Sequence, residues 1–220
     1  MTAGLRKDVW DVIFRIKSVI SAELCQITGG IHVRNSFQFS EKKILRDVRQ
    51  NPLTFPPSFP FTVSVLTLSD LPSVYSLCLG NPLYYKHLNC PLTPDLVQSD
   101  FTALPPGKNC EDKYFLGFCK NGSLAAVMDL VFGYPDEKTV YIGFFMVDRQ
   151  LQGKGTGSLI ISHTADILQR QSYRFMKLAW VEGNRQSEHF WRKNGFEPNG
   201  RSSHLEACTV AEAVRPLQTE

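Results

Sequence analysis

A glycine-rich segment around residue 155 carries the clearest chemical pattern in this sequence. It follows an apolar stretch that ends at Val147 and precedes a helical pattern. Glycines allow backbone conformations that direct consecutive amides toward one point, and a helix N-terminus adds unpaired amides and the positive end of its dipole. The segment therefore predicts a site for a phosphate-bearing ligand. Its residues are Gln152, Gly153, Lys154, Gly155, Thr156, Gly157 and Ser158.

Two widespread phosphate loops do not match this segment. A Walker A loop needs a glycine where Asp148 stands and a serine or threonine directly after Lys154. A dinucleotide-binding loop counted from Gly153 needs a glycine where Ser158 stands, and it needs a preceding βαβ unit. The strands before this loop are expected to form an antiparallel meander instead. Both alternatives are therefore excluded.

The spacing of Gln152, Gly155 and Gly157 resembles the pyrophosphate loop of the GNAT superfamily of acyltransferases, Gln/Arg-x-x-Gly-x-Gly/Ala. A second match lies further on, where Asn184 precedes the run FWRKNGF at residues 190–196. The resemblance implies an α+β fold, in which a twisted, mostly antiparallel central sheet is flanked by helices. It also implies acetyl-CoA as the acyl donor.

The resemblance assigns a role to each part of the motif. The strand end at Met146 and Val147 would pair with the pantetheine arm as an added strand does, and the loop amides would hold the pyrophosphate. Asn184 would contact the cofactor chain or, alternatively, be a simple turn residue. The implied cofactor-binding residues are Met146, Val147, Gln152, Gly153, Lys154, Gly155, Thr156, Gly157, Ser158, Asn184, Phe190 and Trp191.

The sequence departs from the family where acid–base chemistry is expected. Trp191 stands where the family often has a tyrosine that protonates the leaving thiolate, and an indole N–H is no practical proton source. No glutamate stands near Gly143 or Phe144, where the family often has its base. Trp191, Tyr141 and Glu182 are kept as catalytic candidates. Asp129, Glu188 and His163 are weaker ones, each more typical of a structural role.

Two functions of the acyltransferase domain remain open at this point. The first is an N-acetyltransferase that transfers acetyl directly from acetyl-CoA to a primary amine of a small molecule or peptide. The second is a catalytically weak or inactive acyl-CoA-binding regulatory protein, which the missing acid and base favour. A coenzyme A thiolate is a tolerable leaving group without an acid, so the first function does not need a tyrosine at position 191.

Hydrophobic patterning predicts the elements that position the loop. Strands are expected over residues 61–68, 114–119, 124–132, 139–147 and 175–181. Helices are expected over residues 70–79, 93–102, 155–171 and 187–193. Asn81-Pro82 is expected to end the first of these helices, and Asn121-Gly122 predicts a hairpin turn.

The first quarter of the chain has a different pattern. Residues 7–27 have an apolar stripe at helical spacing, and residues 41–50 are typical of a shorter helix. The proline-rich stretch 55–60 predicts a boundary between an N-terminal extension, residues 1–58, and the acyltransferase domain, residues 59–220. The apolar stripe needs a partner surface, so the extension is expected to pack near a possible homodimer interface.

Bulk properties narrow the remaining choices. The formal net charge is +3 and the six cysteines form no Cys-x-x-Cys pair, so neither nucleic-acid binding nor a metal site is expected. The charges within residues 7–27 speak against a membrane span, and nothing at the start of the sequence is typical of a secretion signal. A cytoplasmic protein is expected.

Overall fold

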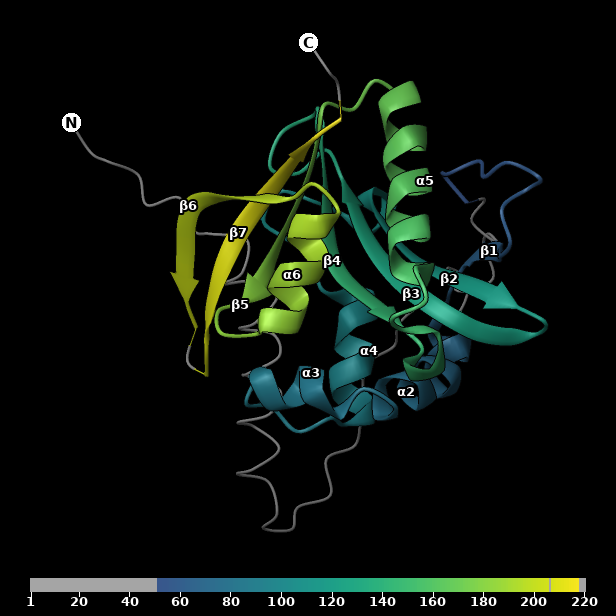
Figure 1. Cartoon of the computed structure of the whole chain (residues 1–220), viewed down its shortest axis with the longest axis horizontal. Helices are drawn as coiled ribbons and strands as arrows, with labels where there is room; N and C mark the ends of the chain where they lie inside the picture. Colours follow the sequence, from purple (N-terminus) through teal and green to yellow (C-terminus); the bar gives the residue numbers. More distant parts are fainter. Residues whose placement is uncertain (1–50, 206, 218–220) are drawn as a thin grey trace, which may run out of the picture.

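The computed structural model describes residues 51–205 and 207–217, and in this part of the chain seven strands form one sheet in the order β1-β2-β3-β4-β5-β7-β6 (Figure 1). Only β4 and β5 pair in parallel, and every other neighbouring pair is antiparallel. The strands are β1 (Thr62–Val65), β2 (Lys113–Lys120), β3 (Ser123–Phe132), β4 (Thr139–Val147), β5 (Phe175–Val181), β6 (Glu197–His204) and β7 (Thr209–Pro216). The predicted α+β architecture is confirmed.

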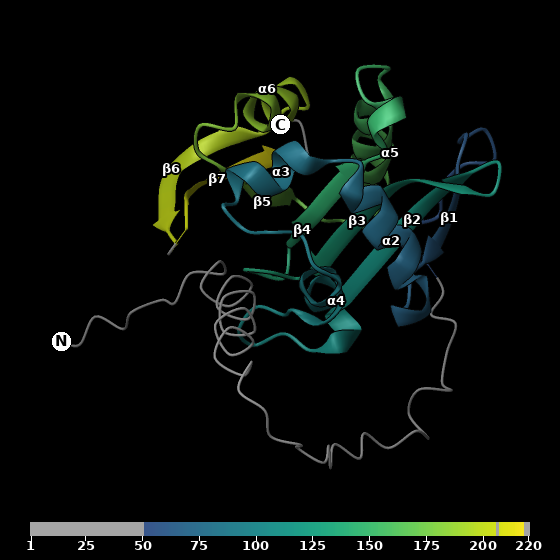
Figure 2. The same ribbon diagram turned by 90° about the horizontal axis from the view of Figure 1, so that it is seen from below.

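Helices cover both faces of this sheet. The α-helices are α2 (Leu71–Leu79), α3 (Pro82–His87), α4 (Pro94–Thr102), α5 (Thr156–Arg170) and α6 (Arg185–Lys193). Short 3-10 turns are η2 (Leu68–Asp70), η3 (Cys110–Asp112) and η4 (Arg149–Leu151). Turned by 90°, the molecule shows α5 and α6 on one side of the strands, with α2 and α4 on the other (Figure 2).

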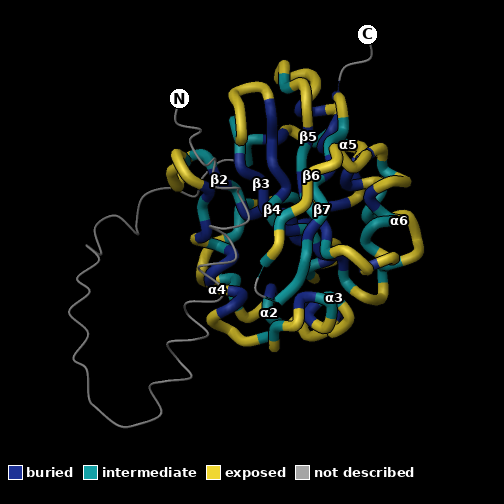
Figure 3. Tube along the Cα trace, turned by 90° about the vertical axis from the view of Figure 1, so that its left-hand side faces the viewer, coloured by how far each residue is buried: buried dark blue, intermediate teal, exposed yellow. Residues whose placement is uncertain are grey.

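The meander that leads to the glycine-rich loop forms as predicted. β2 and β3 join through Asn121-Gly122, and β3 continues antiparallel into β4. Residues 125–131 of β3 are all buried, which explains why this strand is an almost continuous apolar run rather than an alternating one. Dark blue in Figure 3 marks this buried centre of the sheet.

Two parts of the fold were not predicted from sequence. Asn81-Pro82 ends α2 as expected, but a further helix, α3, begins at once with Pro82 in its first turn. β6 and β7 were also missed. β6 has the polar sequence EPNGRSSH because it is the edge strand, and all but one of its residues are exposed.

Two apolar cores lie on the two faces of the sheet. The first packs α5 and α6 against the strands through residues such as Ile160, Leu168 and Trp191. The second packs α2, α3 and α4 through residues such as Val74 and Leu88. Successive side chains of β4 point to opposite faces of the sheet, so β4 contributes residues to both cores.

Residues just before the expected boundary between positions 58 and 59 already pack against this domain. Leu53 and Phe59 are buried in the first core, and the side chain of Gln171 donates a hydrogen bond to the Pro52 carbonyl at 2.8 Å. The helices expected over residues 7–27 and 41–50 lie outside the described residues. The dimer expected from them therefore stays a prediction.

Candidate active site

The main pocket opens where β4 and β5 part. β5 pairs with β4 only along Thr139–Tyr141, and beyond that point no further β4–β5 pairing is made. A pocket of about 750 Å³ occupies the resulting gap. Ile142 and Leu178 lie at its apex, Val147 lies along one wall and Val181 along the other. The carboxyl ends of two diverging parallel strands thus form the walls of the site.

The glycine-rich loop borders this pocket with the geometry of an anion site. Gly155 is the N-cap of α5 and has φ +83°, a left-handed conformation that favours glycine. No side chain among the described residues caps the helix, and the first helical hydrogen bond runs from Leu159 N–H to Gly155 C=O at 2.9 Å. The amides of the first turn, residues 156–158, therefore have no partner within the helix.

The side chain of Gln152 fixes the start of this loop. Its Nε2 donates to Asn81 Oδ1 at 2.6 Å and to the Val147 carbonyl at 2.9 Å. Asn81 is 7% exposed and in turn donates to the carbonyls of Leu77 and Val147. The relative placement of the loop, β4 and α2 thus depends on two amide side chains as well as on backbone pairing.

An aromatic cluster forms the wall contributed by α6. Phe190 stacks on Phe145 with ring centroids 5.8 Å apart, and Trp191 lies 4.9 Å from Phe190 and 5.1 Å from Phe196. Gly157 permits this packing, because a Cβ there would lie 2.9 Å from the Phe190 ring. Trp191 is 7% exposed, so its main contacts are with other rings.

The backbone of β4 presents alternate residues to the gap. Asp148 N–H bonds to Ala125 on β3, and Met146 pairs with Val127, so the backbone groups of these residues face β3. Those of Phe145 and Val147 face the opposite way. The Val147 carbonyl accepts the Gln152 and Asn81 side chains, which leaves its N–H and both Phe145 groups directed toward the gap. An extended amide-bearing arm could pair there.

A bulge in β4 lies at the middle of the pocket wall. Asp129 pairs with Phe144 and Leu130 with Ile142, so Gly143 is the extra residue. A Cβ at Gly143 would collide with Asp129 Oδ2, which explains the glycine. Lys113 Nζ lies 2.6 Å from the same oxygen, and both side chains are buried. Asp129, a candidate base from sequence, is thus held in an ion pair behind the strand.

Most of the implied cofactor-binding residues line the pocket. Those that do are Met146, Val147, Gln152, Gly153, Gly155, Gly157, Ser158, Asn184, Phe190 and Trp191. Lys154 and Thr156 are not among the lining residues. Asn184 combines both interpretations offered by its sequence: it lines the pocket, and its Oδ1 caps α6 by accepting Ser187 N–H at 3.1 Å.

The remaining catalytic candidates are not among the residues that line the pocket. Tyr141 is 1% exposed and packs with Ala103 and Val131, and Glu182 follows β5. Neither lines the pocket, so the structure gives no support to their catalytic roles. His163 is on α5 with its ring 4.9 Å from that of Phe59.

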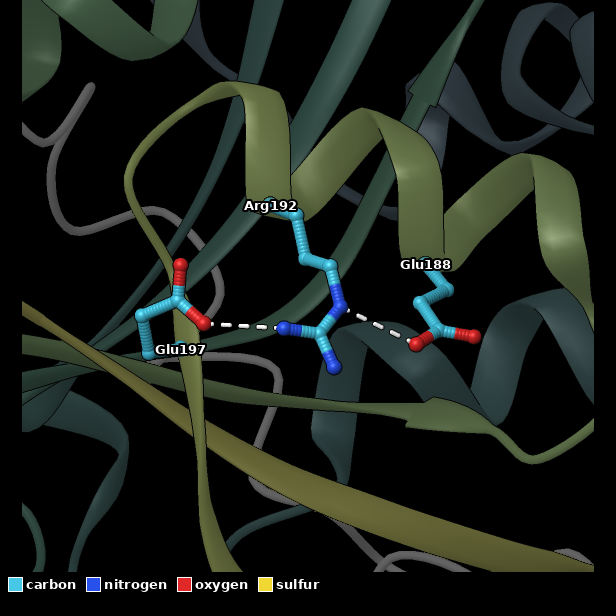
Figure 4. Close-up of polar contacts among 3 residues, drawn as sticks. All are labelled: Glu188, Arg192 and Glu197. Carbon is cyan, nitrogen blue, oxygen red and sulfur yellow. Dashed lines mark hydrogen bonds and ion pairs between the residues drawn. The ribbon is translucent and has the colours of Figure 1, made fainter.

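Glu188 is engaged in a surface ion-pair network. Arg192 Nε lies 3.0 Å from Glu188 Oε1, and Arg192 Nη1 lies 2.8 Å from Glu197 Oε2 (Figure 4). This network joins α6 to the start of β6 on the outside of the molecule. Glu188 therefore has a structural role and is not a base for the pocket.

Several lining residues were missed by sequence reasoning. Tyr84 and Leu88 come from the unexpected helix α3 and the residue after it, and Arg149 and His189 come from η4 and α6. Only His189 could have been found, because it lies on the same helix as the FWRKNGF run. The Tyr84 ring is 5.6 Å from that of Phe144, on the face of β4 opposite to Phe145.

Resolved pKa shifts near the site come from burial. Burial raises the pKa of the Tyr85 hydroxyl far above its ordinary value, and the nearby Cys78 thiol adds to this. Burial also raises the pKa of the Cys208 thiol, beside β7. Neither group lines the pocket.

Neither a metal centre nor a membrane span is found in the described part of the chain. No cluster of three histidine, cysteine, aspartate or glutamate side chains is placed to hold a metal ion among these residues. None of the helices between residues 51 and 217 is long and apolar enough to cross a bilayer.

The fold and the site are those of an acyltransferase, and the comparisons with known proteins agree. The model of the acetyltransferase (GNAT) family matches residues 83–196, more than half of the chain. The chain belongs to this family, as the glycine-rich loop predicted.

Solved structures share the fold at low sequence identity. An acetyltransferase from Thermus thermophilus is 18% identical, with a TM-score of 0.57 over 71% of this chain and 96% of the other. The ribosomal-protein-S18-alanine N-acetyltransferase of Escherichia coli is 17% identical, with a TM-score of 0.53 over 73% and 96% of the two chains. A search of curated proteins gives no match.

Proposed function

We propose that this chain is an N-acetyltransferase, which transfers acetyl from acetyl-CoA to a primary amine of a small molecule or peptide without a covalent enzyme intermediate. The observation that carries the proposal is the gap between β4 and β5, which ends at the unpaired amides of the α5 N-terminus. A long ligand with phosphate at one end and amides along its length matches these two features.

Different residues of the pocket would bind different parts of acetyl-CoA. The amides of residues 156–158 would hold pyrophosphate, with Arg149 and Lys193 as further cationic groups in the lining. Phe145 and Val147 would pair with the pantetheine arm, while Phe190 and Trp191 pack at the acyl end. A backbone amide near the Gly143 bulge would stabilise the developing oxyanion, and orientation of the two reactants supplies much of the remaining acceleration.

The alternative is an acyl-CoA-binding regulator without turnover. The specific observation in its favour is that no aspartate or glutamate stands among the described residues that line the pocket, so no carboxylate base is present there. Release of free thiol from acetyl-CoA in the presence of amines separates the two functions. Amine-dependent release supports the transferase, and binding without release supports the regulator.

A thermal-shift experiment tests the binding site itself. Acetyl-CoA at about 100 times its Kd should stabilise the native protein by about 2.7 kcal/mol and raise its melting temperature. Gly155→Glu should abolish the shift, because it places a bulky anion at the phosphate site. Gly107→Glu is a matched control: Gly107 also has positive φ, and a Cβ there also meets nothing within 4 Å, but it is not in the pocket. An equal shift in both variants would refute the assignment.

A further inference from the structure

The pocket extends through the sheet and has two chemically different ends. The loop, α5 and α6 surround the first end, where Phe145 and Trp191 belong to the core on that face. The second end lies on the opposite face and belongs to the other core. Since the first end matches the acyl donor, the second is left for the acceptor. The residues that surround this acceptor end are Tyr84, Leu88, Phe144, Val181 and Val210.

Among the residues that the structure describes, the acceptor end is apolar and offers no counter-charge to a cation. Of its five residues only Tyr84 carries a polar side-chain atom. The charged residues that line the whole pocket, within the described chain, are the cations Arg149 and Lys193. An ammonium group brought here would lose its hydration without gaining a carboxylate partner, which is strongly unfavourable. A polyamine or a lysine side chain is therefore a poor match.

A hydrogen bond and apolar packing link the segments on the two sides of the acceptor end. Asn89, two residues after α3, donates from Nδ2 to the Ala207 carbonyl at 2.8 Å, although 118 residues separate the two. Leu205 and Cys208 in the β6–β7 turn pack against the same core as Leu88. Figures 1 and 2 both show α3 beside this end of the hairpin. Because these two segments are linked, the space between them suits a small molecule, whereas an extended peptide needs an open groove.

We propose that the acceptor is a small aromatic amine that is uncharged at neutral pH, an arylamine of the aniline class; this inference rests on the proposed function. The rings of Tyr84 and Phe144 offer flat apolar surfaces for its ring. An alkylamine with a pKa near that of lysine is neutral in only roughly one molecule in 2,500 at pH 7. An arylamine is neutral already, because its nitrogen lone pair is shared with the ring.

This acceptor explains why no aspartate or glutamate stands among the described residues that line the pocket. The amine nitrogen forms the new C–N bond to the acyl carbon, the C–S bond breaks, and the sulfur leaves as thiolate. The nitrogen then loses one proton, which the thiolate takes up directly or through water to give free coenzyme A. No carboxylate is needed to deprotonate the amine before attack, and Trp191 is not required to donate a proton.

Two isomeric amines test the proposal with the full chain. 4-Methylaniline and benzylamine have the same atoms and nearly the same shape, but only benzylamine is charged at pH 7. We expect at least about tenfold higher kcat/KM for 4-methylaniline, measured by thiol release with acetyl-CoA, and a flat pH profile for it between about pH 6.5 and 8.5, since no acceptor proton is lost before attack. Spermidine and a short peptide with a free N-terminus should be poorer still.

A charge variant tests the reasoning independently. Leu83 lines the pocket on α3, directly before the acceptor-end residue Tyr84, and is 42% exposed, so Leu83→Glu can fold and would add a carboxylate next to the acceptor end. It should lower the KM for benzylamine at least about threefold relative to 4-methylaniline. Leu79→Glu is the matched control, because Leu79 is 57% exposed but lies outside the pocket lining. An unchanged preference in Leu83→Glu would overturn the charge argument.

The outcomes separate this proposal from the function on which it rests. Faster acetylation of benzylamine, spermidine or the peptide would overturn the acceptor class and leave the N-acetyltransferase standing. An acetyl-CoA thermal shift without turnover of any amine would overturn both in favour of the regulator. A missing thermal shift would remove the donor site, and the acceptor class with it.

Discussion

Replacing Lys113 by methionine tests the buried charge pair behind the β4 bulge. Lys113 Nζ lies 2.6 Å from Asp129 Oδ2, and the two side chains are 5% and 4% exposed. At an effective dielectric constant of about 20, this separation gives an attraction of about 6 kcal/mol. Moving the two charges out of water costs several kcal/mol for each. The intact pair therefore contributes little net stability, but either charge alone would be strongly destabilising.

The expected values follow from this balance. Lys113→Met should lower the free energy of unfolding by about 3–5 kcal/mol, because it leaves the Asp129 carboxylate buried without its cation. Asp129→Leu should cost about as much, by leaving the ammonium. The double variant Lys113→Met/Asp129→Leu should lie within about 1 kcal/mol of the unmodified protein. Urea denaturation at pH 7, with the slope of each transition checked, measures all three.

A more exposed pair supplies the control. Lys108 and Asp112 approach to 3.2 Å with side chains 17% and 29% exposed. Lys108→Met should therefore cost under about 1 kcal/mol. If Lys113→Met costs no more than Lys108→Met, the buried pair is not as isolated from water as its burial indicates. If the losses in the two single variants simply add in the double variant, the residues are not coupled and the reasoning fails.

Substitutions at three further positions probe the cap of η3, the aromatic wall and the contact between α5 and α6. A hydrogen bond from the Asn109 backbone N–H holds the pKa of Asp112 below its ordinary value, so the carboxylate stabilises the fold above its unfolded pKa. Asp112→Ala should therefore lower the free energy of unfolding by about 0.5 kcal/mol at pH 7, after discounting for solvent exposure. In urea denaturation this difference should vanish as the pH falls through the lowered pKa. Trp191→Phe should keep most of the turnover, because the contacts of Trp191 are with other rings. Trp191→Ala should lose most of the turnover and lower the free energy of unfolding by about 3–5 kcal/mol. A severalfold gain in turnover in Trp191→Tyr would show that a thiolate acid is limiting. Gly157→Ala should lower stability by about 1 kcal/mol and weaken acetyl-CoA binding in titration calorimetry, because overpacking against Phe190 outweighs the better helix propensity; unchanged affinity would contradict it.

The donor half of the site could be predicted from sequence because its determinants are local. The left-handed turn at Gly155, the unpaired amides after it and the apolar strand before it are neighbours along the chain. The hairpin at Asn121-Gly122 was predictable for the same reason. Trp191 departs from the family pattern, and the chemistry of an indole already spoke against proton donation; in the structure it lies among rings.

The acceptor half could not be predicted because it depends on contacts between distant residues. Asn89 meets Ala207 across 118 positions, and Lys113 meets Asp129 only through the register of β2 and β3. No short pattern records such pairs. This difference has a functional consequence. Under the proposed function, the donor would be held by backbone amides that most substitutions leave in place, whereas the acceptor would be selected by side chains on α3, β4, β5 and β7. The acceptor would then change by substitution around Tyr84 and Asn89 while the loop, and with it the proposed use of acetyl-CoA, stayed the same.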